Sequence, residues 1–211
     1  MTTMPKMAND TEPRVGEQRP GGRAARVRAA VLAATADLLT EVGYDGLGFD
    51  EVADRAGVHK TTVYRRWPTK PELVADAVGL NIDQRVPIPD TGDLHGDLAA
   101  LAGAVAANIG SAGGALRSRS IVAAAATSDQ LADTLHEFMT RRMIQAEPIV
   151  QRAVERGELA AGADARLIVE SVVGPIWFRL LLTGEAIDEE FVAALVSLVT
   201  AGATSNRIPG S

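Results

Sequence analysis

The sequence contains no cysteine among its 211 residues, which excludes disulfide bonds, thiolate nucleophiles and cysteine-ligated zinc. Its three histidines, His59, His95 and His136, are scattered without a spacing typical of metal ligands. The sequence also has no G-x-x-x-x-G-K-[ST] phosphate-binding loop. We therefore expect no catalytic site, no metal and no cofactor.

The sequence also lacks an apolar run of the about 20 residues that cross a bilayer. Its first residues are polar and have no apolar stretch of the kind found in signal peptides. Hydrophobic residues make up 46% of the chain and charged residues 23%, which is ordinary for a globular protein. We therefore expect a cytoplasmic globular protein without a membrane partner.

Acidic side chains outnumber basic ones by 27 to 21, but the excess is unevenly distributed. Residues 1–85 carry 12 basic and 12 acidic side chains, whereas residues 86–211 carry 9 and 15. Because an acidic region repels DNA, only the amino-terminal part is expected to approach nucleic acid. The acidic part, residues 86–211, is expected to have a different function.

The most informative stretch has the pattern of two short helices joined by a tight turn. Gly57 ends the first, since glycine adopts the left-handed conformation of a helix end without steric cost. In the second helix, at about 100° per residue, Val63 and Trp67 share the inward side. Thr61 and Arg65 point roughly the opposite way, and such hydroxyl and guanidinium groups suit a major groove of DNA.

Basic residues accompany this pattern. The segment from Arg55 to Lys70 contains no acid and five basic side chains: Arg55, Lys60, Arg65, Arg66 and Lys70. A basic run alone could be the solvated face of a small helical bundle. Its coincidence with the spacing of a helix-turn-helix favours DNA binding.

A longer pattern consists of residues 43–47 (GYDGL), 52–53 (VA), 56–58 (AGV) and 62–73 (TVYRRWPTKPEL). With these spacings, about residues 23–78 resemble the amino-terminal domain of the tetracycline-repressor (TetR) family. The resemblance implies DNA contacts by the following residues: Lys60, Thr61 and Thr62 at bases, Tyr64 and Lys70 at phosphates, and Arg65 and Arg66 beside them.

Two positions depart from the pattern of the family. Gly48 stands where a serine or threonine often caps the first helix of the motif and reaches a phosphate. A glycine cap costs only a few tenths of a kcal/mol, so the phosphate contact rather than the fold is affected. His59 stands where serine is common, and it is either a plain turn residue or an additional phosphate contact.

Every periodic segment reads as a helix, so we expect an all-α protein of about nine helices. Residues 1–22 are expected to be a disordered tail, which either enters a minor groove or only aids solubility. Residues 23–70 form the predicted three-helix helix-turn-helix domain. Residues 71–211 form the predicted effector-binding and dimerisation bundle.

Local signals indicate where helices begin and end. Thr69, followed three residues later by Glu72, predicts a capped helix start, and Thr127 with Gln130 predicts another. Pro148 is expected to kink or divide the long helix that follows, because proline cannot donate the helical hydrogen bond.

The last two predicted helices, at about residues 164–183 and 188–203, are apolar nearly all round. Such helices lie either at the centre of a large core or between a core and a partner subunit. The second is favoured, and the TetR resemblance implies a homodimer whose recognition helices lie about one turn of duplex apart on a palindrome. The expected interface residues are Val169, Val173, Ile176, Leu180, Phe191, Leu195 and Leu198.

The helices between residues 94 and 156 would, by the resemblance, enclose a small-molecule pocket. Its expected lining residues are Phe138, Met139, Met143, Trp177, Asn108 and Arg119. Ordinary core packing explains the apolar residues equally well, and the polar ones could instead lie on a solvated face.

The sequence therefore predicts a DNA-binding transcriptional regulator and not an enzyme. We expect a repressor that binds a palindromic operator in double-stranded DNA as a homodimer and is released by a small-molecule effector. The alternative is a dimeric helical interaction module without an effector, which would leave the basic helix-turn-helix unexplained.

Overall fold

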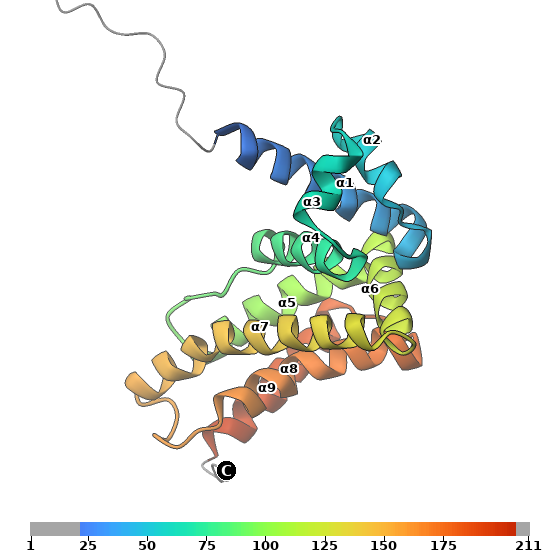
Figure 1. Ribbon diagram of the computed structural model, residues 1–211. Helices are drawn as coiled ribbons and strands as arrows, with labels where there is room; N and C mark the ends of the chain where they lie inside the picture. The colour runs from blue at the N-terminus through green and yellow to red at the C-terminus, as the bar shows by residue number, and fades with distance from the viewer. Residues whose placement is uncertain (1–21, 206–211) are drawn as a thin grey trace, which may run out of the picture.

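The computed structural model describes residues 22–205, and every regular element in that range is helical (Figure 1). The elements are α1 (Gly22–Gly46), α2 (Phe49–Ala56), α3 (Lys60–Arg66), α4 (Lys70–Arg85), α5 (Leu94–Gly110), α6 (Ala112–Ala125), α7 (Asp129–Glu155), α8 (Ala165–Phe178), the π-helical segment η1 (Arg179–Thr183) and α9 (Glu189–Thr204). This confirms the all-α prediction of about nine helices. The expected disordered tail lies outside the described residues except for Gly22, and the domain division at residue 70 stays a prediction.

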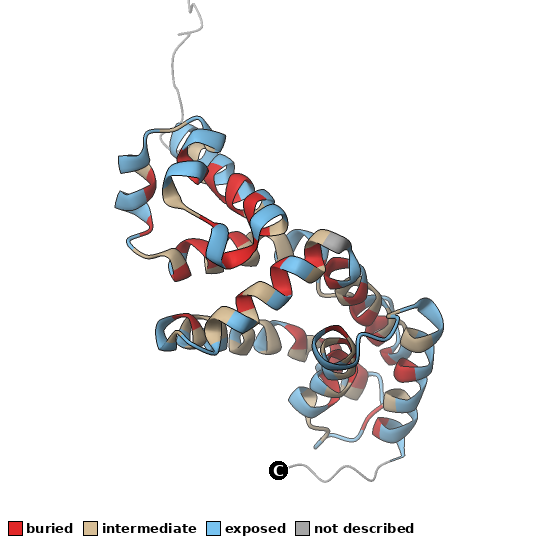
Figure 2. Cartoon of the chain, turned by 90° about the vertical axis from the view of Figure 1, so that its right-hand side faces the viewer, coloured by how far each residue is buried: buried red, intermediate tan, exposed pale blue. Residues whose placement is uncertain are grey.

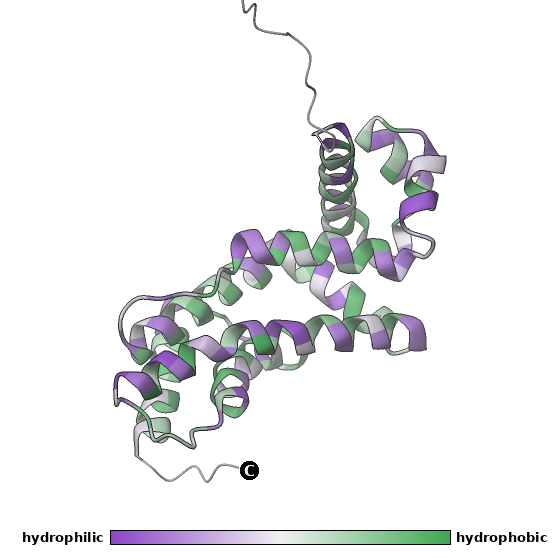
Figure 3. Ribbon diagram, turned by 60° about the vertical axis from the view of Figure 1, so that its left-hand side comes forward, coloured by the Kyte–Doolittle hydropathy of each residue, from purple (hydrophilic) through white to green (hydrophobic). Residues whose placement is uncertain are grey.

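Two hydrophobic clusters organise the described chain. The first lies among α1, α2, α3 and α4 and also takes Ile121 from α6 and Leu131 from α7. The second lies among α5, α7, α8 and α9. Figure 2 shows the buried residues on the inward faces of both groups of helices, and Figure 3 shows hydrophobic and hydrophilic residues alternating along the helices. The head, by which we mean α1–α3, therefore rests on a larger helical body.

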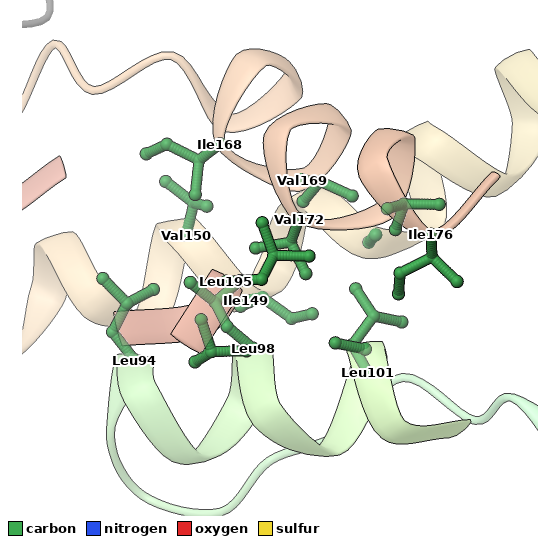
Figure 4. Packing of buried hydrophobic residues seen from close by; sticks show 14 of the residues in the cluster. Leu94, Leu98, Leu101, Ile149, Val150, Ile168, Val169, Val172, Ile176 and Leu195 are labelled. Atoms are coloured by element: carbon green, nitrogen blue, oxygen red, sulfur yellow. The ribbon is translucent and has the colours of Figure 1, made fainter. Parts of the chain in front are cut away.

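The larger body is held together by branched aliphatic side chains (Figure 4). Leu94 and Leu98 of α5 and Val172 and Ile176 of α8 are all 0% exposed. Burying one such side chain contributes about 1.5–3 kcal/mol relative to leaving it in water. This packing fixes α5 against α8, and these two helices form part of the wall of the cavity described below.

Glycines set two sharp features of the head. Gly43 adopts φ 72° and interrupts α1 where the sequence predicts its end, although one further turn follows to Gly46. Gly57 adopts φ 65° after α2 and donates its N–H to the Asp54 carbonyl at 3.2 Å. Both φ values are accessible to glycine at little cost, which is why the two stop signals were readable in the sequence.

Two helix signals in the body need correction. Ser128, and not Thr127, caps α7, with its hydroxyl accepting from Leu131 N at 3.3 Å. Pro148 lies inside α7 and does not divide it, because the helix is continuous from Asp129 to Glu155. The residues that follow the proline are buried in the core, and this packing outweighs the lost hydrogen bond. By contrast, Thr69 caps α4 as predicted and accepts from Glu72 N at 3.5 Å.

The described part of the chain, residues 22–205, has no single helix that is both long and apolar enough to cross a membrane. One pair, Leu94–Gly110 with Gly113–Ala125, meets the length and composition criteria together, but its two helices are bent by 85°.

Candidate nucleic-acid interface and interior cavity

The second helix of the motif, α3, presents the outer face that the sequence predicts. Val63 is 0% exposed and Trp67, directly after the helix, is 4% exposed, so both pack inward. Thr61 and Arg65 are exposed. The polar face of α3 is therefore free to meet a ligand as large as a duplex.

The end of α3 is fixed by one carboxylate. Trp67 Nε1 donates to Asp76 Oδ2 of α4 at 3.0 Å, and Arg28 Nη2 of α1 donates to the same oxygen at 2.9 Å. Hydrogen bonds to a charged acceptor are stronger than neutral ones. Asp76 thus sets the orientation of α3 relative to both α1 and α4.

Two of the predicted DNA-contact residues have partners within the head. The Tyr64 ring stacks on Phe49 of α2 with centroids 4.6 Å apart, while 49% of Tyr64 stays exposed. Lys60 Nζ lies 3.6 Å from Asp50 Oδ2, and both side chains are more than 60% exposed. Such an exposed ion pair contributes little to stability, so an approaching duplex can displace it.

Lys70 is placed differently from the other predicted contacts. Its Nζ donates to the Asp45 carbonyl at 3.3 Å and lies 4.6 Å from the centre of the Tyr44 ring. Burial lowers the pKa of the Lys70 ammonium and raises the pKa of the Tyr44 phenol. Lys70 therefore joins the start of α4 to the end of α1, and a phosphate contact would have to replace its bond to Asp45.

A groove opens between the amino end of α1 and α3. Its lining includes the predicted contacts His59, Thr62, Arg65 and Arg66, and also Arg23 of α1. His59 occupies the N-cap position of α3 without a side-chain capping bond. Arg23 was not among the predicted contacts, because only its place at the start of a basic helix pointed to it. The groove brings four cationic or potentially cationic side chains and one hydroxyl together on the exposed side of the head.

Gly48 is the N-cap residue of α2, as the sequence indicates, and it makes no side-chain capping bond. A Cβ atom built on Gly48 would lie 2.0 Å from Oε2 of Glu51. Glu51 is exposed, so the end of its side chain can move to admit a serine. The position is thus compatible with the hydroxyl residue that many TetR proteins have there.

An interior cavity lies between α4, α5, α7 and α8. It is narrow, with a volume of about 60 Å³, and it is open to solvent on one side. Four of the six residues predicted for a ligand pocket line it: Asn108, Met139, Met143 and Trp177. Four further lining residues were not predicted: Ile82, Val86 and Ile88, which lie at the end of α4 and in the following linker, and Arg142 of α7. For Val86 and Ile88 the only signal in the sequence is the alternation of apolar residues with proline in the linker.

Phe138 and Arg119 do not line this cavity, which corrects the prediction for both. Phe138 is 4% exposed and packs toward α4, where its ring would lie 3.7 Å from a Cβ built on Gly79. It is one residue before Met139 and therefore about 100° away around α7. Arg119 is exposed and donates to the Leu180 carbonyl from Nε at 3.0 Å and from Nη2 at 2.8 Å.

A buried polar pair lies at one end of the cavity. Asn108 and Arg117 are each 7% exposed, and Arg117 Nη2 donates to Asn108 Oδ1 at 3.2 Å. Burial, with the nearby charge of Arg85, lowers the pKa of Arg117, but a guanidinium stays charged in proteins. Arg142 also lines the cavity and donates from Nη2 to the Val86 carbonyl at 2.7 Å.

Most of the predicted dimer-interface residues face the protomer's own core, which corrects that prediction. The following five are 0–8% exposed: Val169, Val173, Ile176, Leu180 and Leu195. Phe191 is partly buried, with the Arg179 guanidinium 3.5 Å from the centre of its ring. Leu198 is 72% exposed and can meet a partner.

Leu198 and four other apolar side chains are exposed on the same elements. These are Leu167 and Phe178 of α8, Leu181 and Leu182 of η1, and Leu198 of α9, with exposed fractions of 37–73%. On α8 they continue through Ser171 and the exposed Gly174, so residues 167, 171, 174, 178 and 181 repeat at intervals of four and three. That is the spacing of a helix–helix seam. We call the five large side chains Leu167, Phe178, Leu181, Leu182 and Leu198 the apolar seam.

One helix, α6, contacts the cavity end, η1 and the head through three of the four positions from 117 to 120. Arg117 binds Asn108, and Arg119 binds the Leu180 carbonyl. Ser120 Oγ accepts a hydrogen bond from Tyr44 N at 3.0 Å. A movement of α6 would therefore change the position of the head and of η1, which is part of the apolar seam.

The fold and the exposed face of α3 define a helix-turn-helix DNA-binding regulator whose recognition helix is carried on a larger helical body. Residues 31–77 match the family described as bacterial regulatory proteins, tetR family, and residues 88–199 match the tetracyclin repressor-like C-terminal domain. The chain belongs to the TetR family of transcriptional regulators, and it is a DNA-binding regulator rather than an enzyme.

Similar proteins span nearly the whole chain. AqdR, an HTH-type transcriptional regulator of Rhodococcus erythropolis, is 36% identical over 192 residues, which cover 91% of this chain and 92% of AqdR. The DNA-binding transcriptional repressor TetR of Mycobacteroides abscessus is 31% identical over 172 residues, covering 80% and 88%. The crystal structure of the TetR family transcription regulator SCO0332 is 32% identical with a TM-score of 0.73, covering 84% of this chain and 98% of that chain.

Proposed function

We propose that this regulator is a homodimeric repressor that binds a palindromic operator and releases it when a small molecule occupies the cavity. The observation that carries the proposal is the position of α6. Arg117 ties it to the cavity end, and Ser120 ties it to Tyr44 of the head. An occupant that favours one position of α6 can in this way change the position of α3. It acts as a switch only if it binds the two positions with different affinity.

The DNA contacts follow from the exposed face of α3. We assign base contacts to Lys60, Thr61 and Thr62, whose side chains are short or flexible enough to reach base edges. Phosphate contacts are assigned to the other predicted DNA-contact residues: Tyr64, Arg65, Arg66, Lys70, His59 and, through its backbone, Gly48. Phosphate contacts position the protein and base contacts specify the sequence.

The apolar seam supports the homodimer. Five large apolar side chains exposed on α8, η1 and α9 are unfavourable in water, and exposed apolar patches mark interaction sites. Two copies related by a two-fold axis would bury the same seam from both sides. Two α3 helices would then face successive turns of the duplex, about 34–36 Å apart.

Repression is favoured because the similar Mycobacteroides abscessus protein is named a repressor. A dimer clamped on an operator also blocks access to the promoter without any further contact. Because the proposed partner is double-stranded DNA, we propose that the protein works in the cytoplasm.

The test is binding of the full chain to duplexes from the region upstream of its own coding sequence, measured by fluorescence anisotropy. A palindrome should bind with a two-chain stoichiometry and with an affinity that falls steeply with salt. Sedimentation as a monomer at micromolar concentration would overturn the dimer. Operator affinity that no cavity ligand changes would favour the alternative, a dimeric helical module without an effector.

A further inference from the structure

The lining of the cavity offers hydrogen-bond donors and no acidic group. Within the described residues, its lining has two polar side chains, Asn108 and Arg142, and no carboxylate. A guanidinium can only donate, so the bond from Arg117 at 3.2 Å identifies the Asn108 amide oxygen as the atom facing Arg117. The amide nitrogen of Asn108 is then the atom left to donate elsewhere.

Arg142 has donors to spare at the same cavity. Three of its five N–H groups donate within residues 22–205, to Asp83 at 3.2 Å, to Gln145 at 2.9 Å and to the Val86 carbonyl at 2.7 Å. Its side chain is 11% exposed, whereas the side chain of Asp83 is 60% exposed. The positive charge is thus the more buried half of this ion pair, and it is only partly compensated inside the protein.

A second positive charge lies behind Asn108. Arg117 is 7% exposed, and among residues 22–205 its guanidinium makes no ion pair. Its hydrogen-bond acceptors are the two oxygens of Asn108, at 3.2 and 3.5 Å. Charges act more strongly in a water-poor interior than at the surface. The positive charge therefore favours a negative charge at the Asn108 end of the cavity.

We propose that the cavity binds an apolar molecule that carries one carboxylate. The carboxylate accepts from the Asn108 amide and from Arg142, and the apolar body lies along Met139, Met143 and Trp177. This inference rests on the proposed function, in which the cavity is the effector site. A carboxylate only accepts hydrogen bonds, so it matches a wall that donates. The two methionines are flexible enough to widen the narrow interior around the apolar body.

Three probes with the same eight-carbon chain separate the chemistries: octanoate, 1-octanol and octylamine. Their binding to the full chain is measured by calorimetry at pH 7, and operator release is measured separately by anisotropy. Octanoate should bind about tenfold or more tighter than 1-octanol, because charge-assisted hydrogen bonds are about twice as strong as neutral ones. Octylamine should bind most weakly, since its ammonium would meet two guanidinium groups.

Two variants test whether Asn108 and Arg142 bind the carboxylate. Asn108→Asp offers Arg117 an ion-pair partner and repels the probe, so it should weaken octanoate about tenfold or more while changing 1-octanol little. Arg142→Met should likewise remove the preference for octanoate over 1-octanol. Arg141→Met is the matched control, because Arg141 is exposed, next in sequence and outside the cavity lining. Circular dichroism and operator affinity establish that each variant folds.

The inference is overturned if 1-octanol or octylamine binds as tightly as octanoate. It is also overturned if octanoate binding is unchanged in both Asn108→Asp and Arg142→Met. If octanoate binds as described but leaves the operator bound, the ligand class stands and the effector role falls. If 1-octanol releases the operator as well as octanoate does, the effector role stands and the carboxylate falls.

Discussion

Trp67 Nε1 donates to Asp76 Oδ2 at 3.0 Å, so the residue that ends the recognition helix is held by the helix that lines the cavity. Ile82, six residues further along α4, is part of the cavity wall. At 1.5 Å per residue the two positions are about 9 Å apart along the helix axis. Helix α4 thus connects the cavity wall to the head, in addition to the connection through α6.

Replacement of Trp67 by phenylalanine tests the hold on α3. The ring is kept and the N–H is lost, so the free energy of unfolding should fall by about 1.5–3 kcal/mol, the usual range for a hydrogen bond to a charged group. Asp76 keeps Arg28, so the head should still fold. Urea unfolding gives the stability, and anisotropy should show operator binding weakened at least as much as stability predicts. Full operator affinity in Trp67→Phe would mean that this bond does not orient α3.

The division between base and phosphate contacts is tested by two substitutions on α3. Tyr64→Phe removes one hydroxyl from a ring that stays stacked on Phe49, so affinity should fall several-fold on every duplex alike. Thr62→Ala should instead change the order of preference among operator variants. Each affinity is measured at two salt concentrations, on the operator and on single-base changes. Equal effects of both substitutions on all duplexes would contradict the assignment of roles.

Gly48→Ser should strengthen operator binding by a few-fold. The serine hydroxyl can cap α2 and reach a phosphate, while stability should rise by only a few tenths of a kcal/mol because glycine is already an acceptable cap. Gly48→Ala is the control, since it adds the Cβ that displaces Glu51 but no hydroxyl. If alanine and serine raise the affinity equally, the displacement of the Glu51 carboxylate, and not the hydroxyl, is the cause.

The apolar seam is tested by placing a charge in it. Leu198→Glu and Leu182→Glu should shift the dimer to monomer, weakening association at least about a hundredfold, because an unpaired charge in an apolar interface is costly. Ile144→Glu is the matched control, since Ile144 is 58% exposed on α7 outside the seam. Analytical ultracentrifugation gives the mass of each variant. A dimer that survives both seam substitutions would place the interface elsewhere.

The head could be predicted from the sequence because its signals are local. Gly57 ends α2, Thr69 caps α4, and the spacing of Val63 and Trp67 identifies the buried side of α3. Each of these depends on a few neighbouring residues and on backbone geometry. The place of Gly48 at the start of α2 was instead implied by the TetR resemblance, and Gly48 is the N-cap residue there.

The interface and the cavity were predicted less well, for a physical reason. In a helix that is apolar all round, the sequence pattern does not indicate which side faces the core. The sequence therefore could not show that Ile176 faces the core and Phe178 faces outward. The placing of Phe138 depends on where α4 crosses α7, a tertiary contact that periodicity does not encode. Thr127 and Ser128 are both good caps, and only the structure selects between adjacent candidates.

Ser120→Ala should separate ligand binding from operator release. The substitution leaves Tyr44 N without its 3.0 Å acceptor, and an unsatisfied, partly buried backbone N–H costs about 1–3 kcal/mol. Binding of a cavity ligand should be unchanged, because Ser120 does not line the cavity. Operator release should require several-fold more ligand, because the direct bond from α6 to the head is gone.

Ser118→Ala is the matched control: Ser118 is also buried on α6, and within residues 22–205 its side chain makes no hydrogen bond to the head. The ligand concentration for half-release is measured by anisotropy for both variants. Equal values would exclude the bond between Ser120 and Tyr44 as the link and leave α4, through Asp76, as the connection between the cavity and the recognition helix.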